Sequence, residues 1–245
     1  VCGIDTNTAI ADGANSTWSV SFWMRSTSDL GTAAITNGNH NYDEVFVTAA
    51  TLNGGWYDGF NVDIRGKEIT VLYSYSSSSW YRIITNSNVS EDLYDGAWHQ
   101  VVVTHSGTTD SLAALNSNIK IYVDASAVAT ITASQGGSPH SVTRTWTPYF
   151  GKGGLVGSHV NVFSREVDEC ALWSGHELSA ANVTTIYNSG TPTDLTDTTG
   201  ITVPTKYYRF EETDLGYETI ADGATADEDS VTAVTLDGTD SIYIS

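Results

Sequence analysis

A turn-and-strand motif at residues 95–104 constrains the fold of this chain more than any other feature. It reads Asp-Gly-Ala-Trp-His-Gln-Val-Val-Val-Thr, and a second apolar run, Ile-Lys-Ile-Tyr-Val-Asp, follows at residues 119–124. An Asp-Gly pair is typical of a tight turn, and β-branched and aromatic residues are typical of strands. We therefore expect residues 98–104 and 119–123 to form two strands that pair with each other.

Strand patterns recur along the rest of the chain. Short runs of Val, Ile, Thr, Tyr and Trp alternate with polar residues and are separated by Gly, Asn, Asp and Ser. Besides the two runs above, the clearest are residues 19–25, 60–64, 69–75, 80–85 and 127–132. In the run 19–25, even-numbered side chains such as Phe22 should face one side of a sheet, and odd-numbered ones such as Trp23 the other. This spacing predicts an all-β fold, a two-sheet antiparallel β-sandwich.

One short α-helix is expected near residues 179–189. Ser179 is a suitable N-cap, and apolar residues recur at helical spacing from Val183 to Tyr187. Gly190 then supplies a residue that tolerates the left-handed conformation at a helix end. The Thr-, Asp-, Gly- and Pro-rich composition of residues 191–203 predicts a surface connection beyond the helix.

The charge balance excludes several classes of partner. Lys and Arg together number 10 against 29 Asp and Glu, which gives a formal net charge of −19. Binding to DNA or RNA requires clustered cations that neutralise phosphates, and docking on an anionic membrane has the same requirement. No run of about 18 apolar residues is present, so membrane insertion is not expected either.

Five motifs, taken in chain order, support a family assignment. They are residues 21–25 (SFWMR), 95–99 (DGAWH), 121–124 (IYVD), 167–173 (VDECALW) and the expected helix with its flanks at 178–190. Together they resemble the laminin-G-like, or concanavalin A-like, jelly-roll family of lectins and glucanases. The resemblance implies a jelly roll that serves mostly in recognition, with enzymes as a minority. Ala125 departs from the pattern, because a Gly usually turns the chain after Asp124, so we expect a longer or differently shaped hairpin there.

The C-terminal part carries a second, less specific similarity. Residues 187–195, followed after a spacer by Tyr207-Tyr208-Arg209-Phe210, are similar to jelly-roll domains in virion structural proteins of tailed marine phages. Secreted bacterial surface proteins carry related tails. The implied organisation is a core at residues 1–190 and a C-terminal extension at 191–245. This extension returns to the sandwich or docks to a partner, within one domain overall.

Catalytic motifs are largely absent. Glucanases of this fold use carboxylates in a Glu-x-Asp-x-x-Glu spacing along one strand, which brings acid and nucleophile together. The nearest candidate is Glu166 with Asp168, but Glu169 should point to the other face and no third carboxylate follows correctly. No Gly-x-Ser-x-Gly motif or tight histidine spacing is present, and His99 is expected to pack beside Trp98 as a fold element. We expect a chain without enzymatic activity.

Calcium is the metal that the sequence favours, and no other cofactor is expected. Hard cations bind clustered oxygens, and relatives of this fold often hold calcium at the rim of the sandwich. Asp43 and Glu44, in the stretch 37–44, are the candidate ligands, together with acidic residues of the tail at 222–229. Turn chemistry alone also accounts for these residues.

Aromatic residues suggest a place where a sugar could stack. The candidate platform residues are Trp56, Tyr57, Trp80, Tyr81, Trp146 and Tyr149, all near expected turns. The tryptophans in the strand motifs, Trp98 among them, are better explained as core. Two cysteines, Cys2 and Cys170, leave open both a disulfide bridge and two reduced thiols.

These observations predict two alternative functions. The first is a non-enzymatic module on an extracellular particle, best matched by a decoration or attachment protein on a phage virion surface. Its partner is a capsid or tail protein of the same particle, and a homo-oligomer is compatible with this role. Rim loops and the tail after Gly190 are expected to make the contacts. The second is a secreted, lectin-like domain, or an accessory module of a polysaccharide-degrading enzyme, that binds a cell-surface glycan.

Overall fold

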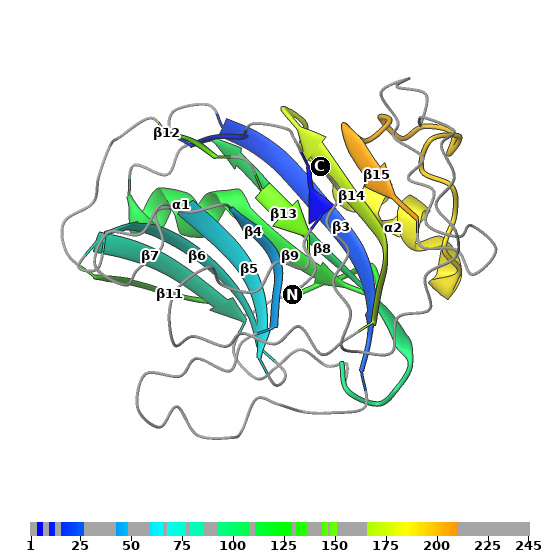
Figure 1. The fold of residues 1–245 in the computed structure, drawn as a ribbon, viewed down its shortest axis with the longest axis horizontal. Helices are drawn as coiled ribbons and strands as arrows, with labels where there is room; N and C mark the ends of the chain where they lie inside the picture. Colours follow the sequence, from blue (N-terminus) through cyan, green and yellow to red (C-terminus); the bar gives the residue numbers. More distant parts are fainter. Residues whose placement is uncertain are drawn as a thin grey trace.

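The computed structural model describes thirteen stretches of the chain. They are residues 4–6, 10–12, 16–26, 43–48, 59–65, 68–76, 79–85, 93–107, 111–128, 131–136, 144–146, 148–150 and 166–209. Within these stretches the protein is a sandwich of two antiparallel sheets that face each other (Figure 1). The predicted all-β jelly roll is thereby confirmed. None of the described helices has the length and apolar character needed to cross a membrane.

A seven-stranded sheet forms one layer of the sandwich. Its strands, in spatial order, are β1 (Ile4–Asp5), β13 (Pro148–Phe150), β4 (Asp43–Thr48), β5 (Gly59–Arg65), β6 (Glu68–Ser76), β7 (Ser79–Thr85) and β11 (Ile131–Gly136). A separate pair joins β12 (Arg144–Trp146) to β2 (Ile10–Asp12).

A six-stranded sheet forms the other layer and includes the motif at residues 95–104. Its strands, in spatial order, are β10 (Ser126–Ala127), β9 (Ile119–Val123), β8 (Trp98–Gly107), β3 (Ser16–Arg25), β14 (Glu166–Ser174) and β15 (Lys206–Tyr208). The expected pairing of β8 with β9 is confirmed, with Val101 opposite Val123. Strand β3 lies between β8 and β14 at the centre of this sheet.

Two of the expectations for the strands and turns are wrong. The run 127–132 is not one strand, since it contains the end of β10 and the start of β11, which belong to different sheets. The hairpin after Asp124 is not elongated: Val123 lies opposite Ser126, so only Asp124 and Ala125 form the turn. Their φ angles of 48° and 62° are left-handed, and Ala125 adopts the conformation that usually favours Gly.

Helix α2 (Ala180–Tyr187) confirms the predicted helix and its N-cap. The Ser179 hydroxyl accepts a hydrogen bond from the Asn182 amide at 3.2 Å, and the Asn182 side chain accepts one from the Ser179 amide at 3.0 Å. This reciprocal pair is a capping box. The chain leaves the helix at Asn188, with φ 46°, and continues through a 3₁₀ turn, η1 (Asn188–Gly190).

A second helix, α1 (Leu112–Asn118), has no counterpart in the sequence analysis. It is one short segment between β8 and β9 and buries Leu115. The one signal for it is Ser111, whose hydroxyl accepts a hydrogen bond from the Ala114 amide at 3.1 Å as an N-cap. Seven residues are too few to show a helical period.

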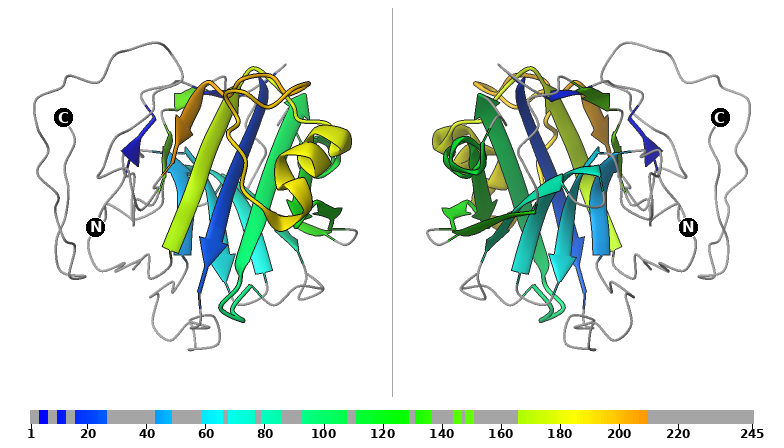
Figure 2. Two further views of the ribbon diagram at one scale, coloured as in Figure 1. Left: turned by 90° about the vertical axis from the view of Figure 1, so that its right-hand side faces the viewer. Right: turned by 90° about the vertical axis from the view of Figure 1, so that its left-hand side faces the viewer.

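Burial divides the six-stranded sheet into two faces. The inner face meets the seven-stranded sheet in a core to which Phe22 and Leu172 contribute. The outer face is covered by α2 and the chain after it, where Trp173 and Ile186 belong to a second apolar cluster (Figure 2). The expected alternation along β3 is confirmed, but the side chain of Trp23 is buried too, at 2% exposure, and stacks on Tyr187 with 5.8 Å between ring centres.

The described part of the tail, up to Arg209, contributes to this outer layer. Strand β15 pairs with β14, placing Cys170 opposite Tyr208 and Ala171 opposite Tyr207. The Trp173 indole Nε1 donates a hydrogen bond to the Thr202 carbonyl at 2.6 Å. Residues 191–205 thus hold fixed contacts with the sheet that α2 also covers.

Candidate functional site

The three carboxylates of β14 lie close in sequence but face different surroundings. Glu166 is exposed and accepts a hydrogen bond from Arg25 Nε at 2.6 Å, across the β14–β3 pair. The Asp168 carboxylate accepts a hydrogen bond from the Glu169 amide at 2.7 Å. The register of β14 against β3 shifts between Asp168 and Ala171, and Glu169 has a left-handed φ of 51°. This bulge turns Glu169 into the protein, where 5% of the residue is exposed.

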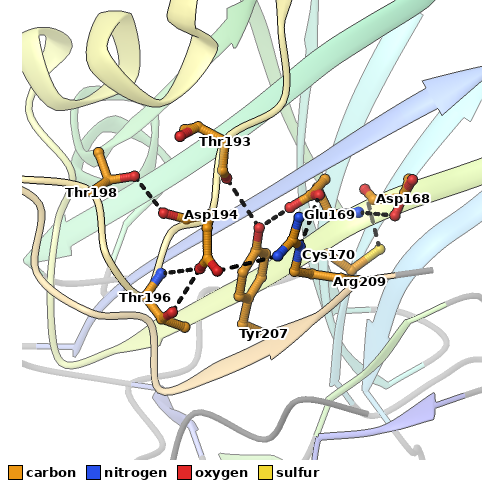
Figure 3. A network of polar contacts seen from close by, with 9 residues as sticks. All are labelled: Asp168, Glu169, Cys170, Thr193, Asp194, Thr196, Thr198, Tyr207 and Arg209. Atoms are coloured by element: carbon orange, nitrogen blue, oxygen red, sulfur yellow. Dashed lines mark hydrogen bonds and ion pairs between the residues drawn. The ribbon is translucent and has the colours of Figure 1, made fainter. Parts of the chain in front are cut away.

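Glu169 is the buried centre of a polar network between β14 and the chain after α2 (Figure 3). Its carboxylate accepts hydrogen bonds from the Tyr207 hydroxyl and, at 3.3 Å, from Arg209 Nε. Arg209 Nη1 also reaches Asp194 Oδ2 at 3.1 Å, and the Tyr207 hydroxyl lies 3.1 Å from the Thr193 carbonyl. We call Glu169, Thr193, Asp194, Tyr207 and Arg209 the Glu169 network.

Asp194 is held as a carboxylate in this network. Burial raises the pKa of Asp194, but hydrogen bonds from the Thr196 hydroxyl and amide and the charge of Arg209 outweigh it, so the pKa is lowered from its usual value. The Glu169 carboxylate is buried and accepts from Tyr207 and Arg209, and hydrogen bonds to an ionised group are stronger than neutral ones. The network therefore fastens residues 193–209 to β14.

His99 links the two turns that the opening motif brings together. Its Nδ1 lies 2.7 Å from Asp124 Oδ2, and its Nε2 lies 3.2 Å from Asp95 Oδ1. Burial lowers the pKa of His99, but the two carboxylates raise it more, so the pKa lies above its usual value. The sequence predicts that His99 packs beside Trp98; in the structure His99 is hydrogen-bonded to both turns, and 6% of the residue is exposed.

The aromatic residues expected to stack on sugars do not form one platform. Trp56 and Tyr57 lie outside the described residues. Trp80 in β7 is half-buried beside Arg82, whose Cζ is 5.6 Å from its ring centre, whereas Tyr81 is buried in the core at 2% exposure. The expectation for Tyr81 is therefore wrong, because its side chain points to the inner face.

The remaining aromatic candidates lie on separate strands. Tyr149 in β13 is half-buried, and three strands of the same sheet, β4, β5 and β6, lie between it and β7, which carries Trp80. Trp146 belongs to β12, opposite Ile10 of β2, in the separate two-stranded pair.

The calcium candidates Asp43 and Glu44 lie at the start of β4. Glu44 is opposite Asp63 of β5, and Asp43 is opposite Ile64. Within the described residues no group of three or more His, Cys, Asp or Glu side chains is arranged to hold a metal ion. The acidic tail at 222–229 and Cys2 lie outside the described part of the chain. Cys170 is a free thiol, and burial raises its pKa well above the usual value.

Trp98 lies in a different environment from the one that its strand motif predicts. It was expected in the core, but 36% of it is exposed, because it begins β8 at the end of the sheet. The Arg25 guanidinium lies over its ring, with Cζ 5.0 Å from the ring centre. Arg25 is opposite both Trp98 and Glu166 in the sheet, so the three residues form a cross-strand row, which we call the Trp98 row.

The Trp98 row lies on the outer face of the six-stranded sheet, next to the cross-strand row that α2 covers. That covered row lies on the same face, two residues further along the strands, and contains Asp168, Trp23 and Gln100. There Tyr187 stacks on Trp23, and the Gln100 side chain donates a hydrogen bond to the Ile186 carbonyl at 3.3 Å. Helix α2 thus covers that row, whereas the side chains of Arg25 and Glu166 are 43% and 59% exposed.

Comparison with known proteins identifies the family. A family model described as the concanavalin A-like lectin/glucanases superfamily matches residues 3–184, and the chain belongs to this superfamily. Among curated proteins, none matches the sequence.

Several solved structures are similar to this chain at low sequence identity. The binding domain of botulinum neurotoxin serotype G is 15% identical with a TM-score of 0.46, covering 74% of this chain and 37% of that one. The binding domain of serotype C1 is 15% identical with a TM-score of 0.40, covering 73% and 38%. A heptameric SAP-like pentraxin from Limulus polyphemus is 14% identical with a TM-score of 0.37, covering 73% and 74%. This chain spans about two fifths of the length of the neurotoxin structures, and similarity at this level says nothing about ligands.

Proposed function

We propose that this member of the concanavalin A-like lectin/glucanase superfamily is a non-enzymatic recognition module. The observation that carries the proposal is the engagement of the β14 carboxylates. Glu166 pairs with Arg25, Asp168 accepts from the Glu169 amide, and Glu169 is buried in its network. A retaining glycosidase needs an acid and a nucleophile about 5–5.5 Å apart with access to the sugar. The three β14 carboxylates are held in contacts within the protein, so they do not supply that pair.

The site of action in this proposal is the surface of an extracellular particle, and a phage virion fits the sequence best. Support comes from the similarity of residues 187–195 and 207–210 to virion jelly-roll domains. The net charge of −19 favours solubility and a partner with a basic surface, such as a capsid or tail protein. The rigid sandwich supplies a frame on which exposed groups are held in fixed positions.

Two measurements test this proposal. Mass spectrometry of intact purified particles from the source should find the chain as a stoichiometric component. Incubation of the protein with a panel of β-glucans should release no reducing ends above a buffer control. Absence of the chain from the particles contradicts the particle role. Hydrolysis that Glu166→Gln abolishes contradicts the non-enzymatic role.

A lectin-like role is the second candidate. The exposure of Trp98 beside Arg25 favours it, because an exposed indole ring with polar neighbours can stack on a sugar face and hydrogen-bond its hydroxyls. In this role the ligand is a cell-surface glycan, and the module attaches the particle, or a secreted protein, to its host.

A further inference from the structure

We propose that His99 is a protonation-dependent link between two turns at one end of the six-stranded sheet, and that loss of its proton releases the turn at residues 95–97. One turn precedes β8 and contains Asp95, and the other joins β9 to β10 and contains Asp124. We call these three residues the His99 link. The proposal goes beyond the recognition function and does not depend on it.

Both ring nitrogens of His99 face a carboxylate. Nδ1 lies 2.7 Å from Asp124 Oδ2, and Nε2 lies 3.2 Å from Asp95 Oδ1. An ionised carboxylate can only accept hydrogen bonds, and a neutral imidazole has one N–H, whereas the imidazolium has two. Both contacts are therefore hydrogen bonds only when His99 is protonated. Loss of the proton places a nitrogen lone pair against a carboxylate oxygen, and that contact becomes repulsive.

The contact with Asp95 is the one that a neutral ring gives up. Asp124 is held through its other oxygen, because Oδ1 accepts a hydrogen bond from the Gln100 amide at 2.8 Å. The Asp124 side chain is 16% exposed, whereas that of Asp95 is 49% exposed and can rotate into solvent. The contact with Asp124 is also the shorter of the two. We therefore expect neutral His99 to keep its proton on Nδ1, toward Asp124.

The Asp95 carboxylate also holds the turn to which it belongs. The oxygen that faces His99, Oδ1, accepts a hydrogen bond from the Ala97 amide at 2.6 Å. The Gly96 amide donates to the Ser26 carbonyl at 3.0 Å. When Oδ1 turns away from a neutral His99, the bond from Ala97 is lost with it. Of these three contacts, the Gly96 bond alone then holds the turn that leads into β8.

The charged groups around His99 set the pH range in which the link breaks. Burial lowers the pKa of His99, but the hydrogen bonds and charges of Asp124 and Asp95 raise it more, so the pKa lies above its usual value of 6.5. On β3, the residue opposite His99 is the uncharged Met24, and the next residue, Arg25, is engaged in its own ion pair. The link is therefore formed below pH 6.5 and breaks as the pH rises through the raised pKa.

The surface on which the release should be visible is the Trp98 row. Trp98 follows the turn directly, and Arg25 lies over its ring, with Cζ 5.0 Å from the ring centre. The turn at residues 95–97 fixes the chain before Trp98, and pairing with β3 fixes the strand that Trp98 begins. Breaking the His99 link therefore loosens this row from one side and leaves the sheet intact.

The test is an NMR titration of isotope-labelled protein from mildly acidic to alkaline pH. Long-range proton–nitrogen correlations report which ring nitrogens of His99 carry a proton. Both should be protonated at the acidic end, and Nδ1 alone at the alkaline end. The amide signals of Gly96 and Ala97 should shift, and their heteronuclear NOE should fall, along the titration curve of His99. The Gln100 amide, which Asp124 keeps, should stay ordered throughout.

Asp95→Asn is the variant that isolates the link. The new side chain can still accept from the Ala97 amide, and its NH₂ group can donate to a neutral His99. The proton affinity of His99 should fall about threefold, as expected for the loss of an exposed ion pair. The Gly96 and Ala97 signals should no longer follow the pH. His176→Gln, which removes a histidine outside the link, should titrate as the wild type does.

Three results overturn the proposal. They are a His99 ring that keeps one protonation state over the whole range, turn signals that do not follow His99, and an Asp95→Asn turn that still titrates with it. Because the Asp95 side chain is 49% exposed, the melting temperature of Asp95→Asn should stay close to that of the wild type, so its changed titration is not loss of fold. None of these results bears on the recognition function, which is measured on particles.

Discussion

The two faces of the six-stranded sheet are buried by different means. The inner face is closed by another sheet, and long strands with alternating apolar residues, such as Leu172 in β14, fill the space between. The outer face is closed by α2 and the chain after it, which specific polar bonds fasten through Glu169, Tyr207 and Trp173. Within the described residues, apolar alternation buries the inner face, whereas the outer face is buried only as far as α2 and the chain after it extend. The Trp98 row lies where that cover ends.

The largest expected effects are losses of stability at two adjacent residues of β14 that point to opposite faces of the sheet. Leu172 belongs to the inner core and Trp173 to the outer cluster, and both are at most 1% exposed. We expect Leu172→Ala to reduce the free energy of unfolding by about 2–5 kcal/mol and Trp173→Ala by about 3–5 kcal/mol. Urea unfolding followed by circular dichroism measures both. A loss below about 1 kcal/mol for Trp173→Ala would show that the outer apolar cluster contributes little to stability.

The next largest effect is a pH dependence of the free energy of unfolding, which arises from His105 on the inner face. Burial between Trp18 and Tyr73 lowers the pKa of His105 from 6.5 to about 4. As the pH falls from 6.5 to 4, the unfolded chain binds a proton that the folded chain does not. The free energy of unfolding should therefore fall by about 3 kcal/mol, at about 1.4 kcal/mol for each pKa unit. His105→Phe, which keeps the ring contacts, should flatten this decline in urea unfolding series between pH 7 and pH 4.

Other titrating groups allow this assignment to be checked. The raised pKa of His99 acts with the opposite sign: its stabilisation is present below pH 6.5 and is lost as the pH rises through the folded-state pKa. The lowered pKa of Asp194 on the outer face gives stabilisation that is lost only as the pH falls below about 3.8. A decline between pH 6.5 and 4 that persists in His105→Phe would contradict the assignment to the inner face.

A smaller loss of stability is expected from replacing Glu with Gln at two positions of β14. Glu169→Gln places an amide against Tyr207 and Arg209 and should cost about 1–3 kcal/mol, because buried donors lose an ionised acceptor. Glu166→Gln, at the exposed ion pair with Arg25, should cost less than about 1 kcal/mol. Thermal unfolding of the two variants at pH 7 gives the difference. Equal costs would mean that the Glu169 network does not fasten the outer cover.

The smallest effect concerns the turn beside the outer cluster. Ala125 adopts a φ of 62°, which costs a residue with a Cβ more than it costs Gly. Ala125→Gly should raise the free energy of unfolding by up to about 1 kcal/mol, less a small loss of contact with the outer cluster. A matched Ala127→Gly in β10, outside the left-handed turn, should destabilise. Destabilisation by both changes would show that packing, not backbone strain, governs position 125.

The sequence predicted what depends on local patterns. Alternation along residues 19–25 predicted the two faces of β3, because side chains in a strand alternate regardless of what covers them. Ser179 predicted the start of α2, since an N-cap is a local hydrogen bond. The turn after Asp124 was predicted wrongly because the structure tolerates a left-handed Ala that local preference disfavours.

The candidate site could not be predicted, because it depends on where distant segments end. Trp98 lies on the same face of the sheet as the buried Trp23, and only the extent of α2 leaves it uncovered. Glu169 lies under the outer cover because a bulge breaks the alternation that would have pointed it to the face opposite Asp168. Its partner Arg209 lies 40 residues away, directly after β15, a strand whose pairing no local pattern specifies. The Tyr-Tyr-Arg run at 207–209 is a signal for such a partner, but not for its position.

The most direct test of the account is a crystal structure of the protein soaked with neutral oligosaccharides. The lectin-like role predicts a pyranose ring stacked on the Trp98 indole, with hydroxyls hydrogen-bonded to Arg25 and Glu166 and with α2 in place. A sugar bound at Trp80 or Tyr149 instead, with the Trp98 row in contact with solvent only, would contradict it.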